Sequence, residues 1–256
     1  ERFAGNWTDY LVTINREDEA AAKHHSLMAI NKVRYMPGIG VDIDYYSSNA
    51  TSKAEVEKVR QELGLSPDTK LLLSVAEFIP RKHPQDILYA LKNINRNDVY
   101  LAFAGDGDLL KEMQQLANRL GIQDKVRFLG YRNDIPTLMT AAFATILASE
   151  QEGLPRSVME SLCLETPVIG SDIRGTKDLV SPDSGILFPV GNIERLADAI
   201  KYLVNHPSAA SAMGKRGREY INNFDISHVI QLHEALYAEA LSLKPKQINE
   251  YSTQNS

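Results

Sequence analysis

Short apolar runs rich in β-branched residues alternate with longer amphipathic stretches along almost the whole chain. The short runs fit buried strands, whereas apolar residues that recur about every three or four positions fit helices. Since strands that alternate with helices form βαβ units, the pattern predicts an α/β fold around a parallel sheet. The predicted strands are residues 10–14, 33–36, 70–76, 99–104, 126–129, 143–148, 167–170 and 185–188. The predicted helices are residues 16–27, 53–63, 84–93, 109–120, 135–141, 155–164, 193–203, 208–222 and 227–243.

Several predicted helix ends carry residues that commonly start or stop a helix. Gly64 and Gly121 follow two helix ends, where a glycine often closes the last turn. Pro155 fits the first position of its helix, which does not need the amide that proline lacks. Asn192 and Ser227 are candidate caps for the helices that follow them.

The chain divides into unequal parts. Residues 1–37 supply only two strands and one helix, too little to bury a core, whereas residues 53–225 hold enough elements for one complete doubly wound domain. Residues 38–52 combine turn residues with no sustained period and are predicted to be a linker. Residues 226–243 are predicted to be a final helix, and the polar residues 244–256 a flexible tail.

The composition of the chain excludes several classes of protein. The chain has 28 Lys and Arg against 33 Asp and Glu, a net charge of −5, which excludes an electrostatic nucleic-acid binder. No window approaches the roughly 18 uninterrupted apolar residues that a membrane span needs, and residues 1–6 lack the pattern of a signal peptide. A single cysteine and no Cys/His cluster with zinc spacing fit a reducing cytoplasm and no structural metal. We therefore expect a cytoplasmic protein.

The most informative stretch is residues 144–175. A predicted strand ends near Ala148, and a helix opens after Gly153, so Glu152 and the next amides lie outside the carboxyl end of a parallel strand. Open α/β sheets bind ligands there, and the positive end of a helix attracts anions. Glu160 lies about two turns along the same helix and is placed to face the same crevice. A phosphate-containing ligand is therefore expected.

Two further loops follow predicted strands. Arg81 and Lys82 begin the helix after strand 70–76, where they either neutralise a diphosphate or form a solvated helix start. Gly105 and Gly107 give a tight turn after strand 99–104. This turn is not the dinucleotide fingerprint, because position 110 is leucine.

Other polar residues have plainer explanations. The six histidines show no metal-binding pairs, so exposure or capping is favoured over metal binding. Cys163 lies on the apolar face of a helix and is favoured as buried packing over a nucleophile. Asp172 and Arg174 follow another predicted strand, where they either contact a ligand or form a satisfied loop pair.

The order of these motifs resembles a known family. The motifs are S-V-A-E-F-x-x-R-K-H, A-G-D-G, V-R-F-L-G-Y-R-N-D-I, E-G-L-P-R-S-V-M-E and T-P-V-I-G-S-D-I-R-G. In this order they closely resemble the carboxyl-terminal half of retaining, GT-B-fold glycosyltransferases of family 4, over about residues 11–241. The resemblance implies a doubly wound, Rossmann-like donor domain preceded by a remnant of the N-terminal acceptor domain.

The resemblance also implies roles for individual residues. Glu152 would lie at the donor sugar and Glu160 would hold the ribose of the nucleotide, while Arg81 and Lys82 would grip the phosphates. With Glu152, Arg81 and Lys82 as the catalytic group, the remaining implied donor-binding residues are Gly105, Gly107, Tyr131, Arg132, Ser149, Gly153, Leu154, Pro155, Arg156 and Ser157. Many members have arginine in place of Glu77, but a polysaccharide-building branch has glutamate there. The segments T-D-Y-L-V-T-I-N-R-E-D and P-G-I-G-V-D resemble the same branch, at the end of its acceptor domain and its hinge.

The implied activity is transfer of a hexose or N-acetylhexosamine, with retention. The donor would be a nucleotide diphosphate sugar, with UDP favoured, and the acceptor a glycan or polyprenyl-linked molecule in polysaccharide biosynthesis. No cofactor or divalent metal is expected, and peripheral association with the inner membrane face is left open. Since most of the acceptor domain would be absent from these residues, the chain alone should show little or no transfer, and residues 1–37 and the final helix should expose an apolar patch.

Two other functions stay open. The first alternative is a non-catalytic nucleotide-sugar-binding subunit that needs a separate acceptor polypeptide. A phosphorylase or nucleotide-sugar epimerase on the same fold is a weaker alternative, because E-G-L-P-R-S-V-M-E suits the transferases better.

Overall fold

A parallel sheet forms the centre of the computed structural model, which describes residues 7–47 and 51–243. In this part of the chain, six strands lie in the order β5-β4-β3-β6-β7-β8, and every neighbouring pair is parallel. Their bounds are β3 (Lys70–Val75), β4 (Val99–Ala104), β5 (Val126–Phe128), β6 (Ala144–Leu147), β7 (Val168–Ser171) and β8 (Gly185–Phe188). The α/β class and the doubly wound parallel sheet are therefore confirmed.

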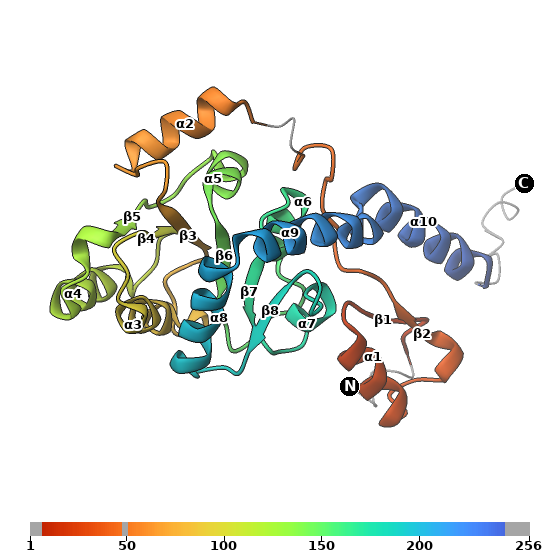
Figure 1. Cartoon of the computed structure of the whole chain (residues 1–256). Helices are drawn as coiled ribbons and strands as arrows, with labels where there is room; N and C mark the ends of the chain where they lie inside the picture. Colours follow the sequence, from red (N-terminus) through yellow and green to blue (C-terminus); the bar gives the residue numbers. More distant parts are fainter. Residues whose placement is uncertain (1–6, 48–50, 244–256) are drawn as a thin grey trace, which may run out of the picture.

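Helices cover both faces of the sheet (Figure 1). The α-helices after the linker are α2 (Lys53–Glu62), α3 (Pro84–Ile94), α4 (Leu110–Leu120), α5 (Ile135–Ala141), α6 (Arg156–Cys163), α7 (Thr176–Leu179), α8 (Ile193–Asn205), α9 (Pro207–Ile221) and α10 (Ile226–Leu243). Short 3₁₀ turns are η3 (Pro80–Lys82), η4 (Gln123–Lys125) and η5 (Asn222–Phe224).

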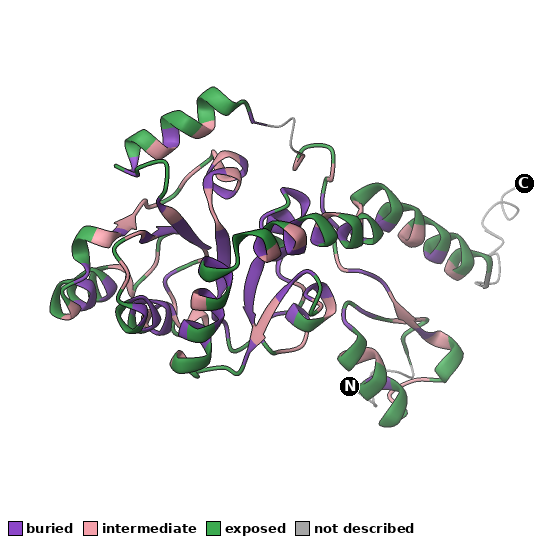
Figure 2. Ribbon diagram, in the orientation of Figure 1, coloured by how far each residue is buried: buried purple, intermediate pink, exposed green. Residues whose placement is uncertain are grey.

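The alternation of side chains along β3 explains why both faces are covered. Leu72 belongs to the apolar cluster built with α3, α4 and α8, whereas Leu71 and Leu73 belong to the cluster built with α2 and α5. All three leucines are at most 1% exposed, and burial of each contributes about 1.5–3 kcal/mol. Figure 2 shows the resulting pattern, with buried strands and helices whose outer faces are exposed.

The N-terminal segment lies apart from this sheet, below α10 in Figure 1. It contains β1 (Leu11–Thr13), α1 (Arg16–His24), η2 (Ile30–Lys32) and β2 (Val33–Tyr35), with β1 parallel to β2. Helix α10 runs back along this segment, and Arg34 forms an ion pair with Glu239 at 3.1 Å. The segment thus contacts the last helix of the chain.

Helix α1 also contacts the region around α7. Asp18 pairs with Arg174 at 2.8 Å and Glu17 pairs with Lys177 at 2.7 Å, and all four side chains are exposed. These contacts place the N-terminal segment beside the loop that follows β7.

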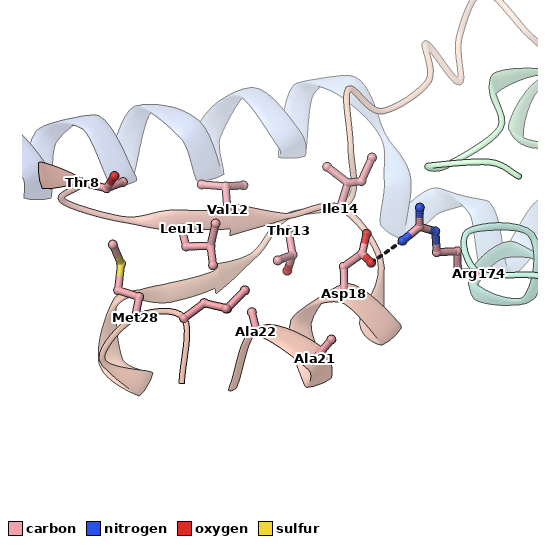
Figure 3. A pocket seen from close by; sticks show the side chains of 11 residues that line it. Thr8, Leu11, Val12, Thr13, Ile14, Asp18, Ala21, Ala22, Met28 and Arg174 are labelled. Carbon is pink, nitrogen blue, oxygen red and sulfur yellow. Dashed lines mark hydrogen bonds and ion pairs between the residues drawn. The ribbon is translucent and has the colours of Figure 1, made fainter. Parts of the chain in front are cut away.

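Apolar surface remains open on the N-terminal segment. Val12 and Ile14 are each 37% exposed, and Ile230 and Leu241 of α10 are more exposed still. A largely apolar pocket of about 590 Å³ lies among β1, α1 and Met28, with the ion pair of Asp18 and Arg174 at its edge (Figure 3). Two strands and one helix therefore do not cover their own apolar side chains.

The predicted elements are present with small shifts of their ends. All eight predicted strands and all nine predicted helices occur, and Gly64 and Gly121 adopt φ angles of +70° and +66° just past their helices. The Asn192 side chain caps α8 by accepting a hydrogen bond from the amide of Arg195 at 3.0 Å. The predicted tail, residues 244–256, lies outside the described residues.

Two expectations about helix ends were wrong, and one short helix was not predicted. Pro155 stands at the N-cap of α6, so the helix begins one residue later, at Arg156. Ser227 lies inside α10, where Asp225 accepts hydrogen bonds from its amide and hydroxyl instead. The short helix α7 was missed, because a stretch of four residues is too short to show a helical period.

The described residues contain no helix that is both long and apolar enough to cross a membrane.

Gly105 offers a test of how tightly the loops at the sheet edge pack. Its φ is +152°, and a Cβ there would lie 2.0 Å from the carbonyl oxygen of Ala76, whereas a Cβ on Gly121 would have nothing within 4 Å. We expect Gly121→Ala to lower the free energy of unfolding by about 1–2 kcal/mol, the ordinary penalty of a left-handed residue. Gly105→Ala should lower it by at least about twice as much, as measured by urea denaturation. Equal losses for the two variants would contradict this packing.

Candidate ligand-binding site

The candidate site lies where the strand order of the sheet changes direction. β3 pairs with β4 on one side and with β6 on the other, so the chain leaves β3 toward one edge of the sheet and later returns to β6. Open α/β sheets usually bind ligands at the carboxyl ends of the strands where the strand order changes direction, and here these are the ends of β3 and β6. Both loops carry residues that the sequence singled out.

A buried ion pair joins the two loops. Lys82 Nζ lies 2.5 Å from Glu152 Oε1, and the two side chains are only 14% and 10% exposed. Removing two charges from water is costly, so a pair of this kind is retained only with good geometry or a function. The structure thus brings together two of the three residues expected to be catalytic.

Backbone contacts hold the same loops in place. The Glu150 amide donates to the Arg81 carbonyl at 2.9 Å, and Arg81 Nη1 donates to the Gln151 carbonyl at 3.3 Å. Arg81 is therefore at the predicted place, but its guanidinium is engaged with the neighbouring loop. The two loops form one connected unit.

His83 adds a contact that the sequence did not predict. Its Nδ1 lies 3.2 Å from Asp86 Oδ2, and its Nε2 lies 3.2 Å from Glu150 Oε2. Burial raises the pKa of Asp86, and the imidazole opposes that shift. The available signal was the position of His83 directly after Lys82, but its partner Glu150 is 67 residues away in the sequence.

The glycine turn after β4 packs against the loop after β3. The Phe78 amide donates to the Asp106 carbonyl at 2.9 Å, and a Cβ on Gly107 would lie 2.6 Å from the Phe78 carbonyl oxygen. The Gly105 amide donates to the carbonyl of Gly130 at 2.8 Å. The two glycines thus permit the turn after β4 to pack closely against the backbone of the loop after β3.

The start of α6 is fixed by the N-terminal segment. A Cβ on Gly153 would lie 2.9 Å from Ile14 Cδ1, and the Gly153 carbonyl accepts a long hydrogen bond from Asn15 at 3.5 Å. The turn through Leu154 leads into α6, whose first amides have no partners within the helix and carry the positive end of its dipole. This end of α6 is chemically suited to an anion.

Glu160 lies inside α6 and is held by two side chains. Tyr46 donates a hydrogen bond to Glu160 Oε1 at 2.8 Å, and Arg156 Nη2 lies 3.4 Å from the same oxygen. Burial raises the pKa of Glu160, while the hydrogen bond and the nearby cation oppose the shift. Burial and the Glu160 charge raise the pKa of Tyr46. Tyr46 was missed because it belongs to the predicted linker.

Tyr131 and Arg132, two residues expected to bind the donor, follow β5. The Arg132 guanidinium pairs with Asp134 at 2.7 Å and with Glu62 at 2.6 Å, so its charge is already partnered. The Tyr131 side chain is 81% exposed. The structure does not connect these two side chains to the Lys82–Glu152 pair.

Ser149 and Cys163 both have buried side chains. The Ser149 hydroxyl at the end of β6 has no hydrogen-bond partner within residues 7–47 and 51–243. Cys163 is 1% exposed, and burial raises the pKa of its thiol to about 12, so it packs in the core as expected.

Among the described residues, no three His, Cys, Asp or Glu side chains are grouped to hold a metal.

The loop after β7 borders open space beside the site. Arg174 pairs with Asp18 of α1, not with Asp172, so the expected loop pair is replaced by a contact with the N-terminal segment. A polar pocket of about 500 Å³ lies here. It is lined by Glu17, Glu150, Gln151, Asp172, Ile173, Arg174 and Lys177. A second molecule has room to approach the Glu152 loop from this side.

Comparison with known proteins points to one family. Residues 55–220 match the family model described as glycosyl transferases group 1. The chain is 27% identical to N-acetyl-alpha-D-glucosaminyl L-malate synthase of Bacillus anthracis, covering 89% of this chain and 61% of that protein. It is also 27% identical to UDP-Gal:alpha-D-GlcNAc-diphosphoundecaprenol alpha-1,3-galactosyltransferase of Escherichia coli, covering 93% and 62%. The chain thus spans about three fifths of the length of these relatives.

Solved structures show the same fold. Anabaena Alr3699/HepE in complex with UDP superposes with a TM-score of 0.83 at 23% identity, covering 92% of this chain and 65% of that one. WaaG, a glycosyltransferase involved in lipopolysaccharide biosynthesis, superposes with a TM-score of 0.76 at 19% identity, covering 88% and 62%. At these identities the likeness supports the GT-B-like fold alone.

Proposed function

Because the chain belongs to the glycosyl transferases group 1 family, we propose that it is the donor-binding part of a retaining enzyme in polysaccharide biosynthesis. The enzyme would move a hexose or N-acetylhexosamine from a UDP-sugar to a glycan or polyprenyl-linked acceptor. The observation that carries this proposal is the buried pair of Lys82 and Glu152 beside the start of α6. The pair would supply a cation for phosphate and a carboxylate for sugar hydroxyls at one place.

Charge at the leaving group would be offset by fixed groups of the protein. In the reaction, the bond from the anomeric carbon to the diphosphate oxygen would break, the acceptor oxygen would bond to that carbon, and the acceptor proton would pass to the departing diphosphate. Lys82 and the first amides of α6 would stabilise the negative diphosphate that leaves, as preorganised donors do in many enzymes. Glu152 would orient the donor sugar. We propose no divalent metal in this step.

UDP is the favoured nucleotide because the descriptions of similar proteins name it. One similar structure is described as a complex with UDP, and one similar enzyme is named for a UDP-galactose donor and a diphosphoundecaprenol acceptor. A polyprenyl-linked acceptor would bring the reaction to the inner membrane face. The polar pocket beside Glu150 and Arg174 would let an acceptor approach the donor sugar.

A second candidate is a non-catalytic nucleotide-sugar-binding subunit. The exposed apolar residues of the N-terminal segment and the pocket of about 590 Å³ favour contact with further protein. That protein could be an acceptor domain in the same chain or a separate acceptor polypeptide. The two candidates share the donor site and differ in whether the assembled protein transfers sugar.

Binding of UDP tests the shared donor site. We expect the chain to bind UDP in isothermal titration calorimetry in the presence of EDTA, because the phosphate ligands proposed here belong to the protein. GDP and ADP serve as comparisons for base preference. An absence of heat with all three nucleotides up to millimolar concentration would remove the donor-site assignment.

Lys82→Ala tests the phosphate contact. The variant should weaken UDP binding by about 1.5–3 kcal/mol, the range of a charge-assisted hydrogen bond, and weaken uridine binding much less. Lys92→Ala, an exposed lysine on α3, is the matched control and should change neither affinity. Equal weakening of UDP and uridine would indicate a disturbed loop in place of a lost phosphate contact.

Sugar transfer tests the need for further protein. With the same UDP-sugar and crude lipid-linked acceptors, we expect negligible transfer by residues 1–256 and clear transfer by a form that also carries an acceptor domain. The reason is proximity, since holding both reactants in place contributes about 7–11 kcal/mol at best. Equal rates from both forms would show that residues 1–256 already contain an acceptor site. No transfer by either form would favour the non-catalytic subunit.

A further inference from the structure

The linker between β2 and α2 reaches the candidate site through Tyr46. The Tyr46 hydroxyl donates to Glu160 Oε1 at 2.8 Å, across 114 positions of the sequence. Its ring is partly buried against apolar clusters that include Leu147 and Leu73 of the sheet. Tyr45, its neighbour, is 56% exposed. Of the two adjacent tyrosines, Tyr46 thus contacts α6, whereas Tyr45 faces solvent.

The path of the linker is fixed before it reaches Tyr46. The Val41 amide donates to the Phe224 carbonyl, and the Ile226 amide donates to the Val41 carbonyl, each at 2.9 Å. Arg218 Nη2 donates to the Ile43 carbonyl at 3.2 Å. These contacts tie the linker to the junction of α9 and α10, so the direction of Tyr46 toward α6 is set by backbone interactions.

The carboxylate of Glu160 is engaged at one oxygen only. Both Tyr46 and Arg156 approach Oε1, and Oε2 accepts no hydrogen bond from the part of the chain that the structure describes. Glu160 is 8% exposed overall, and Oε2 is not among the fully buried atoms that lack a partner, so this oxygen is accessible from outside the protein. A carboxylate held at one oxygen presents the other in a fixed direction and is suited to accept from a ligand hydroxyl.

The family resemblance already implies that Glu160 holds the ribose of the nucleotide. We propose that Tyr46 is a positioning residue for that contact, which orients Glu160 so that its Oε2 accepts a hydrogen bond from a ribose hydroxyl. This inference rests on the proposed function of the same site. It makes the linker a part of the nucleotide site, because a residue outside the sheet domain sets the geometry of a residue within it. Removing the Tyr46 hydroxyl frees the Glu160 side chain and leaves its buried carboxylate with one partner fewer.

The test compares UDP with 2′-deoxy-UDP and 3′-deoxy-UDP by isothermal titration calorimetry. The parent chain should bind one deoxy analogue about tenfold more weakly than UDP, the loss of one hydrogen bond to a charged group. Tyr46→Phe should weaken UDP about tenfold and that analogue hardly at all, so the preference for the hydroxyl disappears. Tyr45→Phe is the matched control and should leave both affinities and the preference unchanged.

A second variant separates positioning from stability. 3-Fluorotyrosine at position 46 keeps the size and the hydroxyl donor, so it should keep the preference for the ribose hydroxyl whatever Tyr46→Phe does to the melting temperature. Glu160→Gln should lose the preference, and addition of Tyr46→Phe to it should cause no further loss of UDP affinity, because both changes interrupt one chain of contacts.

The outcomes distinguish the two proposals. If the parent chain binds no nucleotide, both the proposed function and this inference are overturned. If the parent chain binds UDP and Tyr46→Phe weakens UDP and the deoxy analogues equally, the donor site stands and the positioning role is overturned. If Tyr46→Phe keeps the full preference for UDP over the deoxy analogue, the positioning role of Tyr46 is overturned as well.

Discussion

The reversal of strand order between β3 and β6 is the constraint on which the site depends. A parallel sheet needs a crossover after every strand, and at this one position the crossovers leave toward opposite edges. The loops after β3 and β6 therefore lie side by side at the carboxyl ends of these strands, and Lys82 and Glu152, 70 residues apart, form an ion pair between them. The glycine turn after β4 packs against the loop after β3, and the loop after β6 leads into the start of α6. Moving either strand would separate every group proposed to act on the nucleotide.

Much of this arrangement could be predicted from the sequence, for a physical reason. Strand and helix periods are local signals, so all eight strands were found, and the placement of Lys82 and Glu152 at carboxyl ends of strands followed from the fold class. Side-chain partners are not local. The contact of Tyr46 with Glu160 and the engagement of Arg132 by Glu62 depend on how distant segments pack, which no periodicity records. The roles given to these residues stay predictions.

Two kinds of contact stabilise the molecule in different ways. The sheet is stabilised by leucine and isoleucine side chains buried on both faces, whose contribution comes from apolar surface removed from water. The N-terminal segment is joined to it through hydrogen bonds and ion pairs at the surface, through one linker and through α10. The pair of Lys82 and Glu152 is therefore attached to the buried sheet, whereas Ile14 and Asn15, which contact Gly153, belong to the segment that is joined to it by fewer contacts.

The pairs of Asp18 with Arg174 and of Glu17 with Lys177 stabilise the contact between α1 and the region after β7 only weakly. Exposed ion pairs contribute about 0–1 kcal/mol each and weaken as salt rises, because counterions screen charges that face water. Energies of this size are close to thermal energy at room temperature. A rise in salt concentration should therefore weaken the attraction between α1 and the loop after β7, while the hydrogen bond from the Arg16 amide to Asp178 Oδ1 at 2.9 Å still joins α1 to α7.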